Sequence, residues 1–102
     1  VTARLDTLLS GTLKSIERIE LLKIDAQGAD LTVLKSAGAF LYPDFVRTVL
    51  VEINFQTFYR DQESAFTIMK YLEDRGYRLA RMYQHRAYDD WLWWADVLFI
   101  KA

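Results

Sequence analysis

The hydrophobic pattern of this chain alternates between strand-like runs and helix-like stripes. Residues 20–25 form a short apolar run that is typical of a buried strand, and residues 46–53 form a second run rich in β-branched side chains. Between the two runs, apolar residues recur at helical spacing, and Asp30 lies in the first turn, where the helix dipole favours a negative charge. The stripe consists of Leu31, Val33, Leu34, Ala37, Phe40 and Leu41. Gly38 and Pro43 bracket the predicted end of this helix.

The second half of the chain predicts one more helix and then two strands. Ser64 is suited to cap a helix that stops at Gly76 and has an apolar face of Ala65, Ile68, Met69 and Leu72. Residues 77–83 alternate as a third strand, and residues 95–101 form a fourth. Residues 84–94 have no helical period, so we expect these strands to form an antiparallel hairpin. Residues 4–9 are expected to form a short strand or turn that leads into a helical stretch.

Composition narrows the functional class. A chain of 102 residues with 52% hydrophobic and 15% aromatic content is expected to be a single folded domain. The formal net charge is −1, and the 13 basic and 14 acidic residues are spread evenly, so nucleic acid is an unlikely partner. Cysteine is absent, which excludes disulfides and thiolate metal sites. No apolar run approaches the roughly 20 residues that span a bilayer. We see no signal peptide and expect a cytoplasmic protein.

A strand–turn–helix junction is the most informative motif. The stretch LLKIDAQGAD, residues 21–30, carries an apolar strand through a glycine turn into a helix. Such a turn usually lies at the carboxyl end of a parallel sheet, where α/β enzymes bind ligands. Residues 21–37 resemble the signature of the FkbM-type S-adenosylmethionine-dependent methyltransferase family, with Asp30 where the family usually has Glu. The resemblance continues at residues 49–52, 76–77 and 96–99.

This resemblance implies an α/β fold that is the C-terminal half of a Rossmann-like methyltransferase sheet. Two parallel strands with helices would be followed by an antiparallel hairpin, with the final strand between the second and third. Enzymes of this class hold the cofactor at a glycine-rich turn, where close backbone approach requires residues without a Cβ. The four glycines of this chain form no G-x-G. We therefore expect residues 1–102 to be a partial methyltransferase domain that lacks the glycine-rich cofactor-binding half.

The function implied by the resemblance is methyl transfer from S-adenosylmethionine to a hydroxyl of a small molecule, a sugar or a lipid. We expect this activity of the complete enzyme and expect the isolated chain to be inactive. The alternative is a non-catalytic binding or oligomerisation module that kept this half-sheet. The missing G-x-G favours the alternative for the chain as given, and the match over residues 21–37 favours an enzyme ancestry.

Two carboxylates end the two predicted parallel strands. Asp25 and Glu52 would therefore lie at the same edge of the sheet and could serve as base and orienter in deprotonating an alcohol. In the family pattern the position of Asp25 borders the methyl donor and acceptor, so Asp25 and Gly28 are the expected cofactor contacts. Alternatively, Asp25 is a turn or helix N-cap residue, and Glu52 is solvated or paired with a cation. Lys23 faces the same side as Asp25 and would pair with a buried acid or reach into the site.

Aromatic residues supply the remaining candidates. The loop after residues 46–53 contains Asn54, Phe55 and Tyr59, which could wall a substrate pocket, although aromatics more often cap a core. Trp91 begins a group of three tryptophans in four residues, of which at least one must be exposed because strand residues alternate in facing. That group could form a substrate lid, a core or an oligomer contact.

The sequence also bears on metal binding and on self-association. His85 is the only histidine and matches no metal motif, so no metal site is expected. The strand at residues 20–25 would have a bare edge, and bare edges recruit other strands. We therefore expect a homo-oligomer, formed through that edge or through the tryptophans.

Overall fold

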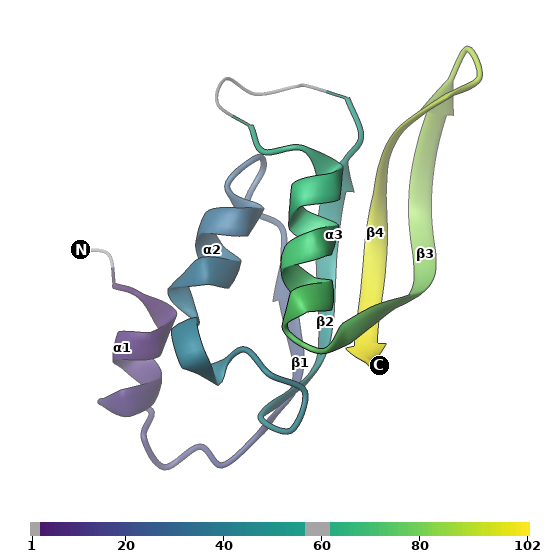
Figure 1. The fold of residues 1–102 in the computed structure, drawn as a ribbon. Helices are drawn as coiled ribbons and strands as arrows, with labels where there is room; N and C mark the ends of the chain where they lie inside the picture. The colour runs from purple at the N-terminus through teal and green to yellow at the C-terminus, as the bar shows by residue number, and fades with distance from the viewer. Residues whose placement is uncertain (1–2, 57–61) are drawn as a thin grey trace.

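The computed structural model describes residues 3–56 and 62–102, and it places helices on one face of a single sheet (Figure 1). Tyr59 and the side chain of His85 lie outside the described part. The elements in chain order are α1 (Leu5–Ser10), β1 (Ile19–Ile24), α2 (Asp30–Ser36), the 3₁₀ turn η1 (Gly38–Phe40), β2 (Val46–Asn54), α3 (Ala65–Asp74), β3 (Tyr77–Tyr88) and β4 (Trp91–Lys101).

The strand order in the sheet is β1-β2-β4-β3. β1 and β2 are parallel, while β4 is antiparallel to both β2 and β3. The predicted α/β arrangement of two parallel strands followed by an antiparallel hairpin is therefore confirmed, and the final strand does lie between the second and the third. The described helices include none long and apolar enough to cross a membrane.

The hydrophobic core lies between the sheet and the helices. Along β2, Val49, Val51 and Ile53 are fully buried under α2 and α3, whereas the alternate residues Leu50 and Glu52 are only half-buried. This two-residue alternation shows that the helices cover one face, because a strand sends successive side chains to opposite sides. The described residues place no helix on the other face, which we call the open face.

The predicted burial of the first strand is wrong. Within β1 only Ile24 is buried, and Leu21 is 51% exposed. The reason is position: β1 is an edge strand with one neighbour, and Leu21 faces the open side of the sheet. The expectation for residues 4–9 is also corrected, because these residues enter the helix α1 directly and bury Leu9.

The hairpin is longer than its predicted strands. Asp89 and Asp90 form its two-residue turn with φ angles of 48° and 68°. Two successive positive φ angles are the type I′ geometry, whose twist matches that of paired strands, and Asp tolerates this conformation. The tip therefore extends beyond the helices, at the same end of the molecule as the carboxyl ends of β1 and β2 (Figure 1).

Candidate active site

The turn after β1 brings the backbone sharply into α2. Gln27 and Gly28 both have positive φ, 49° and 99°, and the Ala29 amide donates to the Ala26 carbonyl at 3.2 Å. A positive φ near 100° suits glycine because it lacks a Cβ. The sequence therefore requires Gly28 for the turn itself, whatever further contact it makes.

Asp30 stabilises this turn through a hydrogen bond to its backbone. Its side chain is 2% exposed, and its Oδ1 accepts a hydrogen bond of 2.8 Å from the amide of Ala26. Burial raises the pKa of Asp30, and bonds from backbone amides oppose that shift. The N-cap of α2 is Ala29, which makes no side-chain cap, so the alternative that Asp25 caps the helix is wrong. Asp25 is exposed and projects from the end of β1.

Asp25 and Glu52 meet at the carboxyl edge of the sheet. The parallel register pairs Ile24 with Val51, so the next residue on each strand is one of the two acids. The pKa of Glu52 is raised, first by partial burial and then by the negative charges of Asp25, Asp96 and Asp30. Burial and the neighbouring carboxylates therefore both favour the protonated form of Glu52.

Asp96 is a third acid that we did not single out from the sequence. It lies directly opposite Glu52 in the antiparallel pairing of β2 and β4, so both side chains point to the open face. The sequence did contain a sign that Asp96 is unusual, because it is the only charged residue between Trp91 and Ile100, inside an otherwise apolar strand. The role of this acid depends on which residue of β2 it faces.

Lys23 shares the open face with Asp25, and the expected pairing with a buried acid is not found among the described residues. It is exposed, and the ion pairs of the described residues join it neither to Glu52 nor to another acid. Its position on an edge strand explains this, because the ammonium reaches solvent directly. Lys23 remains available to a ligand at the carboxyl edge.

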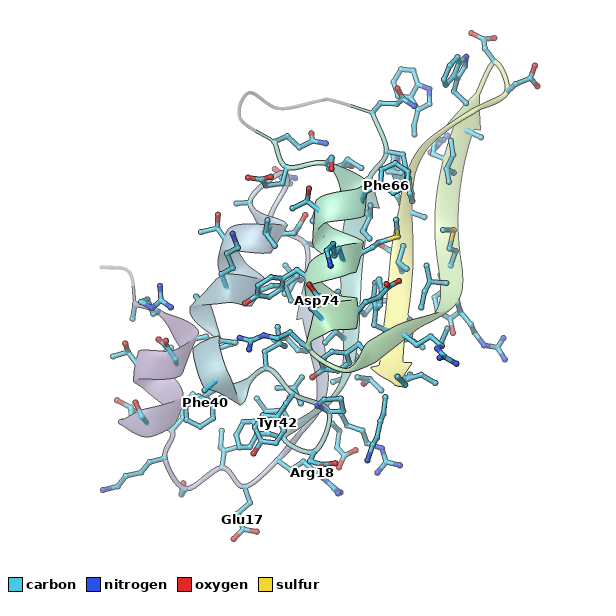
Figure 2. All side chains as sticks on the ribbon, in the orientation of Figure 1. Glu17, Arg18, Phe40, Tyr42, Phe66 and Asp74 are labelled. Carbon is cyan, nitrogen blue, oxygen red and sulfur yellow. The ribbon has the colours of Figure 1, made fainter. Side chains whose placement is uncertain are left out.

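A small pocket opens where β2 ends and α3 begins, and its lining residues do not include Asp25, Glu52 or Asp96. Its volume is 170 Å³, and Asn54 and Phe55 are part of its wall. Asn54 is buried, and the Phe55 amide donates to the Trp93 carbonyl at 2.7 Å, which fixes the start of the loop against β4. The remaining lining residues are Gln56, Gln62, Glu63, Ser64, Ala65 and Phe66. Phe66 is 77% exposed at this end of α3 (Figure 2).

Trp91 is the exposed member of the tryptophan group, as alternation required. It is 65% exposed, whereas Trp93 and Trp94 are half-buried. It precedes Asp96 by five positions on β4, which places it about 17 Å farther along the strand at the usual rise. The backbone therefore does not bring Trp91 beside the carboxylates.

The described part of the chain contains no group of three or more His, Asp or Glu side chains arranged to hold a metal ion. Asp25, Glu52 and Asp96 at the carboxyl edge are therefore not arranged as such a group.

Comparison with protein families gave one match that covers most of the chain. The family described as "Methyltransferase FkbM domain" matches residues 1–79 of 102. These residues include Asp25, Gly28, Asp30 and Glu52. Comparison with curated proteins and with solved structures gave no match.

Proposed function

The chain belongs to the FkbM methyltransferase family, and we propose that its Asp25–Glu52 pair activates the hydroxyl that accepts a methyl group. The observation that carries the proposal is the parallel register, which brings Asp25 and Glu52 to the same edge of the sheet. Partial burial and the charges of Asp25 and Asp96 also raise the pKa of Glu52. A carboxyl group with raised pKa is a stronger base when ionised, and catalytic pKa values work best near the operating pH.

In this proposal Glu52 takes the proton of the acceptor hydroxyl while Asp25 orients that hydroxyl by a hydrogen bond. Asp96 does not touch the acceptor. Its charge, directly across from Glu52, keeps the proton affinity of Glu52 high. Proximity and exclusion of water supply much of the rate in reactions of this type, because the two reacting atoms are held in line.

The carboxyl edge also fits the charge of the implied cofactor. S-adenosylmethionine carries a positive sulfonium, and the neighbouring acids Asp25, Glu52 and Asp96 create a negative field there. Asp25 and the turn at Gly28 would border it, and when bound it supplies an electrophilic methyl group. The chain has no G-x-G turn, so we propose that it alone binds S-adenosylmethionine more weakly than about 1 mM, or about 4 kcal/mol. A micromolar constant in calorimetry would overturn this.

The acceptor side of the site is proposed to use the small pocket at Asn54 and Phe55. Lys23 lies on the same face as Asp25 and could bind a polar group of the acceptor. Tyr59 stays a candidate for covering it from the sequence alone, whereas Trp91 lies too far along β4 to reach the carboxylates directly. A small molecule, a sugar or a lipid hydroxyl is the proposed acceptor class.

Steady-state kinetics on Glu52→Gln and Asp25→Asn in the methyltransferase that contains this domain tests the proposal. Loss of a positioned general base is expected to lower turnover by about 10²–10⁴-fold. Glu73→Gln is the matched control, because Glu73 is exposed on α3. Near-normal turnover in both test variants would refute the assignment.

Exposed apolar residues on the open face favour the alternative, a non-catalytic binding module. The open face presents Leu21 on the edge strand β1 and Ile100 on β4, 51% and 41% exposed. A binding module would associate through these residues, and its association would be indifferent to Glu52→Gln. Measuring turnover and association on the same variant separates the two functions.

A further inference from the structure

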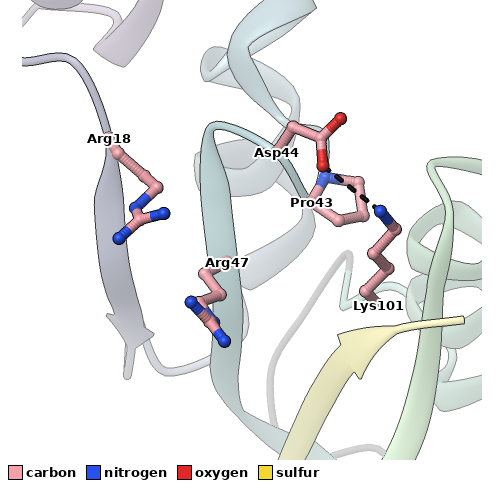
Figure 3. Close-up of a pocket in the computed structure, with 5 residues that line it drawn as sticks. All are labelled: Arg18, Pro43, Asp44, Arg47 and Lys101. Carbon is pink, nitrogen blue, oxygen red and sulfur yellow. Dashed lines mark hydrogen bonds and ion pairs between the residues drawn. The ribbon is translucent and has the colours of Figure 1, made fainter.

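A second pocket lies at the end of the sheet opposite to the carboxylates. Its volume is 260 Å³, and Arg18, Pro43, Asp44, Arg47 and Lys101 line it (Figure 3). Arg47 precedes Glu52 by five residues on β2, so the two ends are about 17 Å apart along the strand. The pocket is therefore separate from the proposed acceptor site.

The charges of the pocket are mainly positive. Three of its five lining residues are cations and one is an acid. Figure 3 shows Arg18, just before the start of β1, and Arg47, near the start of the neighbouring strand β2. Lys101 approaches from the end of β4, where its Nζ lies 3.3 Å from Asp44 Oδ1.

A carboxylate already occupies the space beside the two arginines. Glu20 Oε1 lies 2.6 Å from Arg18 Nη2, and Glu20 Oε2 lies 4.0 Å from Arg47 Nε. One oxyanion thus contacts both guanidinium groups, with one oxygen for each. The fold therefore places two arginines within reach of a single bridging anion.

Most of the donors in this pocket remain available. A guanidinium carries five N–H donors, and the ion pairs of the described residues join Arg18 and Arg47 to Glu20 alone, through one nitrogen of each arginine. Both arginines and Lys101 are more than half exposed. Exposed ion pairs contribute only about 0–1 kcal/mol each. An incoming anion can therefore displace Glu20 and Asp44 at little cost.

We propose that this pocket binds a phosphate group. A phosphate dianion offers several oxygens to two guanidinium groups, whose planar forks match it, and to one ammonium point charge. Monovalent anions gain less, because each cation would keep its present carboxylate. The volume of 260 Å³ lies just below the roughly 300–1,000 Å³ of pockets for drug-sized ligands. The ligand is thus a phosphate that carries at most a small substituent.

Nuclear magnetic resonance titration of the full chain with inorganic phosphate at low ionic strength tests the proposal. Saturable shifts are expected at the amides around Arg18, Arg47 and Lys101. Arg47→Gln and Lys101→Gln should each weaken binding about three- to fivefold, the scale of one exposed ion pair. Asp44→Asn should tighten binding, because it removes the competing carboxylate of the pocket.

Two controls make the result decisive. Lys70→Gln removes a cation that is paired with Asp74 on α3, outside the pocket, and should leave phosphate binding unchanged. Sodium chloride at matched ionic strength should not reproduce the shifts. Equal shifts with chloride, or equal weakening by Lys70→Gln, would show general screening and overturn the proposal.

The source of the phosphate is separated by a second measurement. Vesicles of phosphatidylcholine, with and without phosphatidic acid, are sedimented with the chain and with Arg47→Gln. Binding that requires both phosphatidic acid and Arg47 identifies a lipid headgroup. Binding of free phosphate without vesicle binding identifies a small soluble phosphate ester. Failure of both measurements overturns the proposal.

Discussion

Glu52 on β2 and Asp96 on β4 lie directly opposite each other on the open face of the sheet. Like charges in opposite positions of an antiparallel pair destabilise the sheet by roughly 0.2–1 kcal/mol. Partial burial and the nearby Asp25 add to the effect, and together they raise the pKa of Glu52. The fold thus maintains a repulsive arrangement at one edge of the sheet, as is common where a site requires a particular proton affinity.

The first prediction concerns the stability cost of this arrangement. Because the pKa of Glu52 is raised in the folded state, the folded protein binds more protons than the unfolded chain between the two pKa values. Stability from Glu52 is therefore present below the unfolded pKa and is lost as pH rises through the folded pKa. Glu52→Gln should stabilise the protein by about 0.5–1 kcal/mol at pH 7 and have little effect near pH 4.

Thermal melts across this pH range check the first prediction. For a domain of this size, 1 kcal/mol corresponds to a change in Tm of about 4–8 °C. Glu73→Gln, on the exposed side of α3, should show no comparable dependence on pH. A lower Tm for Glu52→Gln at pH 7 would instead mean that Glu52 is a structural partner.

The second prediction separates the two acids of the turn after β1. Asp30→Ala removes the acceptor of the Ala26 amide, which would lose its partner at a buried position. The expected cost is about 1–3 kcal/mol in the free energy of unfolding. Asp30→Asn keeps a carbonyl acceptor and should cost much less, and Asp25→Ala should change little because Asp25 is exposed. Equal losses for Asp30→Asn and Asp30→Ala in denaturant unfolding would contradict this explanation.

The pairing of Asp25 with Glu52 could be predicted from sequence for a simple reason. Both acids follow apolar runs, and parallel strands that are joined by a helix end at the same edge. The hydrophobic pattern alone is then enough to predict the register between β1 and β2. The order of strands and helices along the chain can be predicted from the same local pattern.

The role of Asp96 needed information that local pattern does not contain. Its partner on β2 depends on which strand β4 joins and on where the hairpin turns. The register of β3 against β4 shifts between Leu79 and Arg81 and again after Tyr83. The exposure of β1 could not be predicted either, because an apolar run does not show whether a strand is central or at an edge of the sheet. These features depend on tertiary arrangement and not on residue type.

The third prediction concerns the link between β3 and the start of β2. Tyr77 is fully buried, and its hydroxyl donates a 2.5 Å hydrogen bond to the carbonyl of Val46. Burial raises the pKa of Tyr77 above its usual value, so the hydroxyl stays protonated. Tyr77→Phe keeps the ring and removes only this bond, which should cost about 1 kcal/mol. Calorimetric melts should show this loss, whereas Tyr83→Phe, on an exposed tyrosine of the same strand, should melt like the parent chain.

The fourth prediction is that the chain self-associates through the free edge of β1. Leu21 and Lys23 are exposed on this strand, whose second edge has no partner among the described strands. Unpaired edge groups recruit another strand, and a two-fold dimer is the simplest closed arrangement. Leu21→Lys adds a charge to the edge and should shift the dimer towards monomer in sedimentation at high micromolar concentration. Leu79→Lys, on the opposite edge strand β3, is the matched control and should remain dimeric. If Trp91→Ala dissociates the dimer and Leu21→Lys does not, the interface lies at the hairpin tip. A parent chain that is already monomeric would refute self-association altogether.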